Sequence, residues 1–166
     1  MKIKWIPTAL LLLLIFLVSC TPNETAPSEI SLPENIPAYV QPSDFEAIDW
    51  DKKAMKFGEA GIIGNENKSG VIGVDAPSLT TQKWMWHVWG IEQNLDTKLT
   101  VVGVHKDLQI VHPILTDGWT IGLSGPVNGA DAHAPSHVKI LQPGQWAILL
   151  YVNEQLFDVL IYDINE

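Results

Sequence analysis

Short apolar runs separated by turn-forming residues fill the sequence from about residue 55 onward, and this pattern constrains the fold more than any other feature. The runs end at Gly, Pro or Asn, and they show no sustained 3.6-residue period of an amphipathic helix. Short strands at this spacing are typical of an antiparallel sandwich or barrel. The pattern predicts strands near residues 55–63, 71–74, 84–89, 99–105, 109–111, 119–123, 137–141, 146–152 and 157–164.

The last two runs favour a sandwich. Residues 146–152 are apolar on both faces of a strand, which predicts a central strand with both faces covered. Along residues 157–164 successive side chains point to opposite faces of the predicted strand, and one of these faces carries Asp158. A strand of this kind after a Gly-x-Trp strand is common in immunoglobulin-like sandwiches. We therefore predict an all-β, immunoglobulin-like antiparallel β-sandwich over residues 44–166, with a small closed β-barrel as the alternative.

The N-terminus resembles a bacterial lipoprotein signal. Lys2 and Lys4 precede an apolar stretch of residues 5–18 that ends in Ser19-Cys20. This stretch is shorter than the roughly 20 residues of a transmembrane helix, and its small residues and basic flank are typical of a signal peptide. The pattern resembles the lipobox, which implies cleavage after residue 19 and a lipid, including palmitate, on Cys20. A plain secretory signal or an uncleaved anchor is the alternative.

A Pro-rich segment follows and predicts a disordered tether over residues 20–43. Its apolar content is low, so it cannot bury enough surface to offset the loss of chain entropy. The segment Ser43-Asp44-Phe45-Glu46 has the form of a capping box and predicts a short helical turn near residues 44–49.

Composition excludes several function classes. The ten basic residues are all Lys, against 19 acidic residues, and the formal net charge is −9. A nucleic-acid partner is therefore not expected, because phosphate contacts need clustered positive charge. Contact with the membrane is expected through the lipid anchor and not through a basic patch. The single Cys cannot form an internal disulfide.

The segment Trp84-Met85-Trp86-His87-Val88-Trp89 is the first candidate cluster. On a strand, Trp84, Trp86 and Val88 share one face, and Met85, His87 and Trp89 share the other. One face must belong to the core. The other offers either an aromatic binding surface or a soft metal site, or it is covered and holds His87 in a structural hydrogen bond.

The segment 128–137 is the second candidate cluster, and it brings Asp131, His133 and His137 within seven residues. A carboxylate and imidazoles are ligands for first-row metals, and His87 or His105 could complete such a set. In the structural interpretation, Asp131 accepts hydrogen bonds from loop N–H groups, and the loop packs over the face of Met85, His87 and Trp89. The candidate ligand or structural cluster is Trp86, His87, Trp89, Asp131 and His133.

Catalytic motifs are missing from the sequence. Ser124 and Ser136 stand outside any Gly-x-Ser-x-Gly elbow, and no Gly-rich phosphate loop is present. We therefore expect no enzyme activity and no cofactor. Trp50 and Trp119 border turns and are the candidates for stacking on the sugar rings of a neutral glycan.

Four segments resemble a family of uncharacterised lipoproteins from bacillus-type Gram-positive bacteria. They are KWMWHVWG at 83–90, LTVVGVHK at 99–106, GPVNGADAHAPSH at 125–137 and PGQWAILLYVNEQLFDVLIYDI at 143–164. The folded domain of that family is a domain of unknown function. The resemblance implies an immunoglobulin-like sandwich and a Gram-positive origin, and it implies no activity.

These observations together predict a lipid-anchored protein on the extracytoplasmic face of the cell membrane. Its domain is expected to be monomeric and non-catalytic and to bind an envelope protein or a glycan. The alternative is an extracytoplasmic metal-binding lipoprotein that uses His87, Asp131 and His133.

Overall fold

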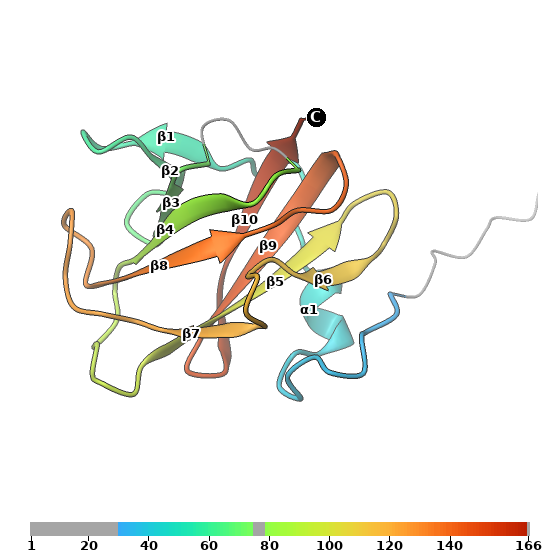
Figure 1. The fold of residues 1–166 in the computed structure, drawn as a ribbon, viewed down its shortest axis with the longest axis horizontal. Helices are drawn as coiled ribbons and strands as arrows, with labels where there is room; N and C mark the ends of the chain where they lie inside the picture. The colour runs from blue at the N-terminus through green and yellow to red at the C-terminus, as the bar shows by residue number, and fades with distance from the viewer. Residues whose placement is uncertain (1–29, 75–78, 166) are drawn as a thin grey trace, which may run out of the picture.

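The computed structural model describes residues 30–74 and 79–165 and contains two antiparallel β-sheets stacked as a sandwich (Figure 1). The signal peptide, Cys20 and the tether up to residue 29 lie outside the described residues. Among the residues described, no helix is long and apolar enough to cross a membrane.

The first sheet has the strand order β1-β2-β3-β4-β8. Its strands are β1 (Met55–Phe57), β2 (Ile62–Asn65), β3 (Ser69–Ile72), β4 (Gln82–Val88) and β8 (Ala132–Val138). The second sheet has the order β10-β9-β5-β6, and β7 also pairs with β5. Its strands are β5 (Lys98–His105), β6 (Val111–Pro113), β7 (Thr120–Gly122), β9 (Gly144–Val152) and β10 (Gln155–Ile164).

The two sheets stay open and separate, so the predicted sandwich is confirmed and the closed barrel is wrong. The finer assignment to the immunoglobulin-like class stays a prediction.

The main core fills the space between the sheets. Trp84 and Trp86 from β4 belong to the same core cluster as Trp146 from β9, and all three side chains are fully buried. The strand β9 lies between β5 and β10 and buries both of its faces, as the apolar run at 146–152 predicts. Tyr162 from β10 donates its hydroxyl to the carbonyl of Ile63 in β2, and burial raises the pKa of this phenol.

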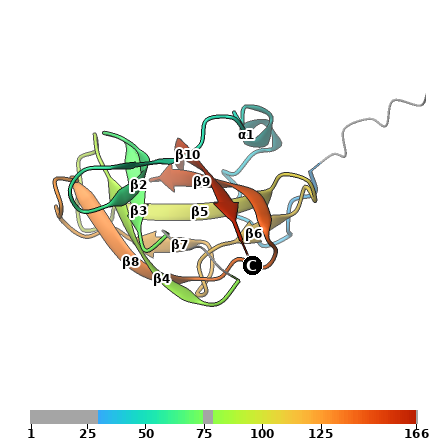
Figure 2. The ribbon, with the colours of Figure 1, turned by 90° about the horizontal axis from the view of Figure 1, so that it is seen from above.

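A second apolar cluster covers the outer face of the β10-β9-β5-β6 sheet. Residues 30–50 run across this face and bury Val40, Phe45 and Ile48 against β5 and β9. Figure 2 shows α1 on one side of this sheet and strands β4 and β8 on the other. The domain boundary predicted at residue 44 therefore needs correction. The packed chain already includes residues 30–43, because their scattered apolar side chains complete this cluster.

The helix α1 (Pro42–Glu46) begins two residues before the predicted turn. Its N-cap is Gln41, and not Ser43, and Asp44 is the N3 residue of the capping box. The carboxylate of Asp44 accepts the N–H of Gln41 at 2.9 Å and the hydroxyl of Tyr151 at 2.9 Å. Pro42 stands at the first turn, where its missing N–H costs nothing. The Tyr151 bond fastens the helix to β9.

The strand β8 was predicted as a loop followed by a strand at 137–141, and this prediction is wrong. Pro135 interrupts the β pattern in the sequence, and a Pro is tolerated in a strand at the edge of a sheet. β8 is such an edge strand, and Pro135 is paired with Met85 of β4. The predicted loop shrinks to the turn around residues 128–131.

Phe45→Ala should lower the free energy of unfolding by about 3–5 kcal/mol, because it leaves a cavity where α1 covers the sheet. Glu46→Ala, on the exposed side of the same helix, is the matched control and should change stability by less than about 0.5 kcal/mol. Urea unfolding measures both variants. Equal stability of the two would show that the segment is not part of the cooperative domain.

Candidate functional site

The strand β4 is buried on both faces near its C-terminal end, and the candidate site lies on its outer face. Trp84, Trp86 and Val88 point into the core between the sheets, as predicted. His87 lies on the opposite face, yet its side chain is 0% exposed. Something must therefore cover the outer face of β4 at this position.

The strands β1 and β2 supply part of that cover. Gly70 of β3 is directly paired with His87, and a Cβ at Gly70 would stand only 2.5 Å from Cγ2 of Ile62 and 3.2 Å from Cε1 of Phe57. The missing side chain therefore lets Phe57 and Ile62 settle over β3 beside the histidine. Ile62 is 2% exposed as a result.

Both ring nitrogens of His87 have partners. Nδ1 lies 3.1 Å from the carbonyl oxygen of Met85, and Nε2 lies 3.0 Å from the side-chain Nδ2 of Asn128. The carbonyl can only accept, so Nδ1 carries the proton and Nε2 accepts from the amide of Asn128. Burial lowers the pKa of His87; the bond to Met85 opposes this shift, and the nearby His133 adds to it.

Asp131 fastens the turn that carries Asn128. Its Oδ2 accepts the backbone N–H of Gly90 at 2.6 Å and that of Ile91 at 3.4 Å. The backbone N–H of Asp131 in turn donates to the carbonyl of Val88 at 3.0 Å. The predicted role of Asp131 as an acceptor of backbone hydrogen bonds is confirmed, and we call this set of contacts the Asp131 clamp.

His133 lies on β8, directly opposite His87 in the β4–β8 register. Its Nδ1 lies 2.6 Å from the carbonyl oxygen of Gly125, so this ring also serves an internal contact. Within residues 30–74 and 79–165, no group of three or more His, Cys, Asp or Glu side chains is placed to hold a metal ion. His87, Asp131 and His133 lie near one another, but their arrangement is not a metal-ligand set.

Trp86 and Trp89, the other two candidates, lie in different environments. Trp86 is fully buried in the core and donates its indole N–H to Ser136 at 2.8 Å, so it cannot reach a ligand. Trp89 is half-buried at the end of β4. Its ring stacks on His87 at a centroid distance of 6.0 Å and meets Phe57 edge-on at 5.6 Å.

A pocket of about 150 Å³ opens beside this aromatic pair. Phe57, Trp89, Ile62 and Asn128 line it, together with two acidic residues, Glu59 and Glu66. We call it the Trp89 pocket. Sequence reasoning found Trp89 but missed Phe57 and the two acidic residues, because the contact between β1–β2 and β4 has no local signal.

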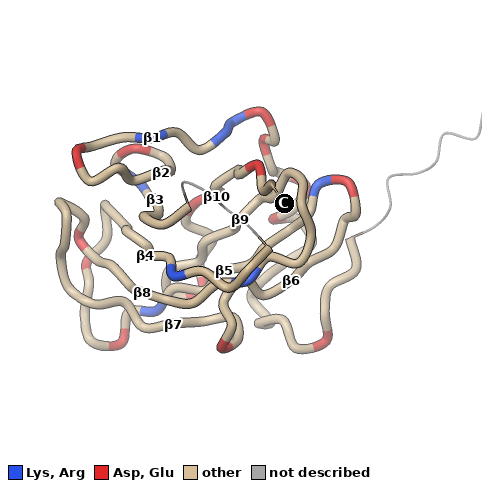
Figure 3. The backbone as a smooth tube through the Cα atoms, turned by 45° about the horizontal axis from the view of Figure 1, so that its top comes forward, with Lys and Arg blue, Asp and Glu red and all other residues tan. Residues whose placement is uncertain are grey.

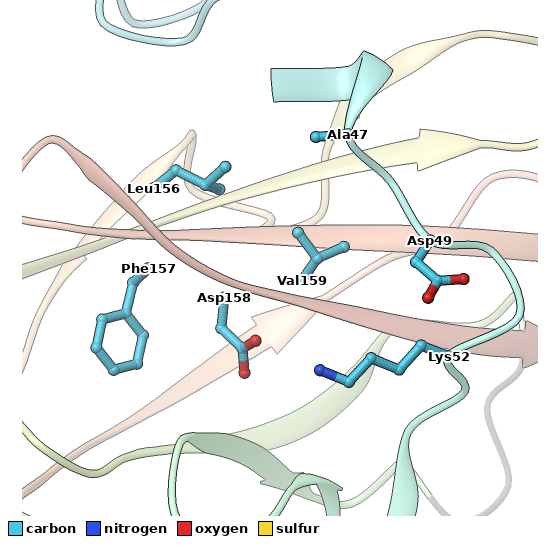
Figure 4. A pocket seen from close by; sticks show the side chains of 7 residues that line it. All are labelled: Ala47, Asp49, Lys52, Leu156, Phe157, Asp158 and Val159. Atoms are coloured by element: carbon cyan, nitrogen blue, oxygen red, sulfur yellow. The ribbon is translucent and has the colours of Figure 1, made fainter. Parts of the chain in front are cut away.

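A second pocket, of about 300 Å³, lies where β10 is interrupted by a bulge between Leu156 and Asp158 (Figure 4). Lys52 extends its ammonium group toward Asp158 across this pocket. The carboxylate of Asp158 accepts hydrogen bonds from Asn65 at 2.9 Å and Ser69 at 2.5 Å. Asp158 therefore ties the two sheets together and is not free for a ligand.

The predicted sugar-stacking residues lie elsewhere. Trp119 is 8% exposed and packs in the outer cluster, so its predicted exposure is wrong. Trp50 is half-buried, and the ammonium of Lys106 stands over its ring at 5.6 Å. Neither ring presents an open stacking face.

Comparison with known protein families identifies the family of this chain. Residues 39–162 match the family described as "Domain of unknown function (DUF4871)". The chain belongs to this family. A comparison with curated proteins finds no match.

One solved structure similar to this DUF4871 chain is described as "X-ray Crystal Structure of a Putative Lipoprotein from Bacillus anthracis". The TM-score is 0.61 at 20% identity, and the match covers 79% of this chain and 97% of the other. At this identity the likeness supports the fold alone. The description of that structure agrees with the resemblance to bacillus-type lipoproteins found in the sequence.

Asp131→Ala should lower the free energy of unfolding by about 1–2 kcal/mol, because two backbone N–H groups lose a charged acceptor that is itself exposed. Asp131→Asn keeps an acceptor oxygen and should recover part of the loss, and Asp117→Ala in an exposed turn is the control. EDTA should leave the melting temperature of the wild type unchanged. A clear drop with EDTA would restore the metal hypothesis.

The folded domain should lose stability as the pH falls, because His87 resists protonation when it is buried. Its pKa is lowered in the folded state, so below about pH 6.5, the ordinary value, the unfolded chain takes up the proton first and stability is lost. His87→Gln can keep both hydrogen bonds without titrating. Urea unfolding at about pH 7.5 and about pH 5.5 should show a smaller loss for this variant.

His112 is present in the wild type and in His87→Gln. Its pKa is also lowered, first by burial and then by the charge of Lys139, so it contributes equally to the pH dependence of stability in both proteins. The difference between wild type and His87→Gln therefore isolates His87. Identical pH dependence of the two proteins would contradict the assignment.

Proposed function

We propose that this DUF4871 protein is a lipid-anchored protein of the extracytoplasmic membrane face. Its immunoglobulin-like domain binds a ligand and does not catalyse a reaction. The observation that carries the binding role is the Trp89 pocket, an aromatic recess on the outer face of a rigid sheet.

Two observations support the anchor. The sequence places its single Cys at the end of a short apolar signal, where a lipobox requires it. The similar Bacillus anthracis protein is described as a putative lipoprotein. A family of lipoproteins would keep this domain outside the cell, tethered through Cys20.

The internal hydrogen bonds support a role without catalysis. Asp131, His87 and His133 are the groups most suited to acid–base work or metal binding, and each hydrogen-bonds to the domain's own chain; His87 uses both of its ring nitrogens in this way. A general base needs a free nitrogen or oxygen within reach of a substrate. His87 has neither nitrogen free, and together with Asp131 it instead holds Trp89 and the turn at Asn128 in place.

The anchor is tested by changing the modified residue in growing cells. Cys20→Ala should abolish labelling with radioactive palmitate and leave a precursor that does not partition into detergent. Thr21→Ala is the matched control and should be labelled and processed normally. Protease added to intact protoplasts should digest the control. Normal labelling of Cys20→Ala, or protection of the control from protease, would disprove the proposal.

A further inference from the structure

We infer that the Trp89 pocket binds the head group of an alkylammonium cation. This inference rests on the proposed binding function and names its ligand class. It follows from the aromatic wall, the charge at the rim and the size of the pocket.

The aromatic wall of the pocket is held in place by contacts of Trp89 and its neighbours with the rest of the sheet. Trp89 is stacked on His87, whose nitrogens are tied to Met85 and Asn128. Its backbone N–H donates to the carbonyl of Lys68 at 2.9 Å, and the next residue, Gly90, donates to the Asp131 clamp. Indole and phenyl rings attract cations through the negative charge of their faces, and Trp is the strongest of the aromatic side chains. Phe57 and Trp89 therefore offer a preformed surface for a cation.

The rim of the pocket carries negative charge. Glu59 lies in the turn between β1 and β2, and Glu66 lies in the turn between β2 and β3, where Figure 3 shows acidic positions. Both side chains are exposed, and in the described part of the chain neither has an ion-pair or hydrogen-bond partner. The carboxylates stand at the pocket that the two rings line, so a bound cation would meet both kinds of group.

The lysine of the same hairpin points elsewhere. Lys56 on β1 extends along Gly61, where its Nζ lies 3.5 Å from the position of a Cβ, and it is not part of the pocket wall. Together with Lys52 and Lys53 it lines a neighbouring pocket, which shares Phe57 and Glu66 with the Trp89 pocket. No lysine therefore fills the place of the ligand's cation in the Trp89 pocket.

The volume limits the size of the group that the pocket can hold. A pocket of about 150 Å³ is smaller than the roughly 300–1,000 Å³ that hold drug-sized molecules. It admits a small head group such as a methylated or primary ammonium at the end of a chain. The remainder of such a ligand would extend from the pocket into solvent.

The test uses choline as the probe and 3,3-dimethyl-1-butanol as its neutral analogue of the same shape. The full lipidated protein, in a maltoside detergent without ammonium groups, is titrated while the indole N–H signals are followed by ¹⁵N NMR. The signal of Trp89 is assigned with Trp89→Phe. Choline should shift it saturably, and the neutral analogue should bind at least about 5-fold more weakly.

Paired charge variants test the rim. Glu59→Gln with Glu66→Gln should raise the Kd for choline about 3- to 10-fold at low salt. Glu34→Gln with Glu46→Gln removes two exposed charges elsewhere and should leave the Kd unchanged. All four positions are exposed, so the variants should fold, and their melting temperatures verify this.

Three results would overturn the inference: no saturable shift of the Trp89 signal, equal affinity for the neutral analogue, or an unchanged Kd in the Glu59/Glu66 variant. The assay does not depend on the lipid, because the unlipidated Cys20→Ala chain can be titrated in the same detergent. Failure of choline binding thus disproves the ligand class, whereas failure of palmitate labelling disproves the anchor.

Discussion

The structure depends on burying both faces of β4. The inner face carries Trp84 and Trp86 and builds the core between the sheets, whereas the outer face carries His87 and Trp89. A histidine at the centre of an exposed sheet face could remain in water, but here it is fully buried. The cost of burying its polar nitrogens is offset by two hydrogen bonds. Those bonds require a specific neighbour at Asn128, and the shape of the adjacent turn follows from that requirement.

Local pattern predicted much of the fold, because strand alternation and turn residues are local properties. The two faces of β4, the central position of β9 and the acceptor role of Asp131 could all be inferred from the sequence. Pro135 misled the prediction of β8, because the tolerance of Pro depends on whether a strand lies at an edge. The Trp89 pocket could not be predicted, because Phe57 and Trp89 meet only through the pairing of β1, β2, β3 and β4.

The same physical problem is solved twice in this sandwich. The outer face of β5 and β9 is apolar, and residues 30–50 cover it, fixed by the bond between Asp44 and Tyr151. The outer face of β4 is covered by β1–β2 and the turn at 128–131, fixed by the Asp131 clamp. The first cover buries Val40, Phe45 and Ile48 in an apolar cluster. The second is partial, and the space that it leaves beside Trp89 is the pocket.

The position of the two covers also relates the pocket to the anchor. The described chain begins at Ile30, next to β6, where Ser31 bridges to Ile110. The turn between β1 and β2 and the turn before β8 lie at the opposite end of the sandwich in both views (Figures 1 and 2). A protein tethered through residues N-terminal to Ile30 would thus hold the β6 end nearest its attachment. The Trp89 pocket would then lie at the end of the sandwich opposite this attachment.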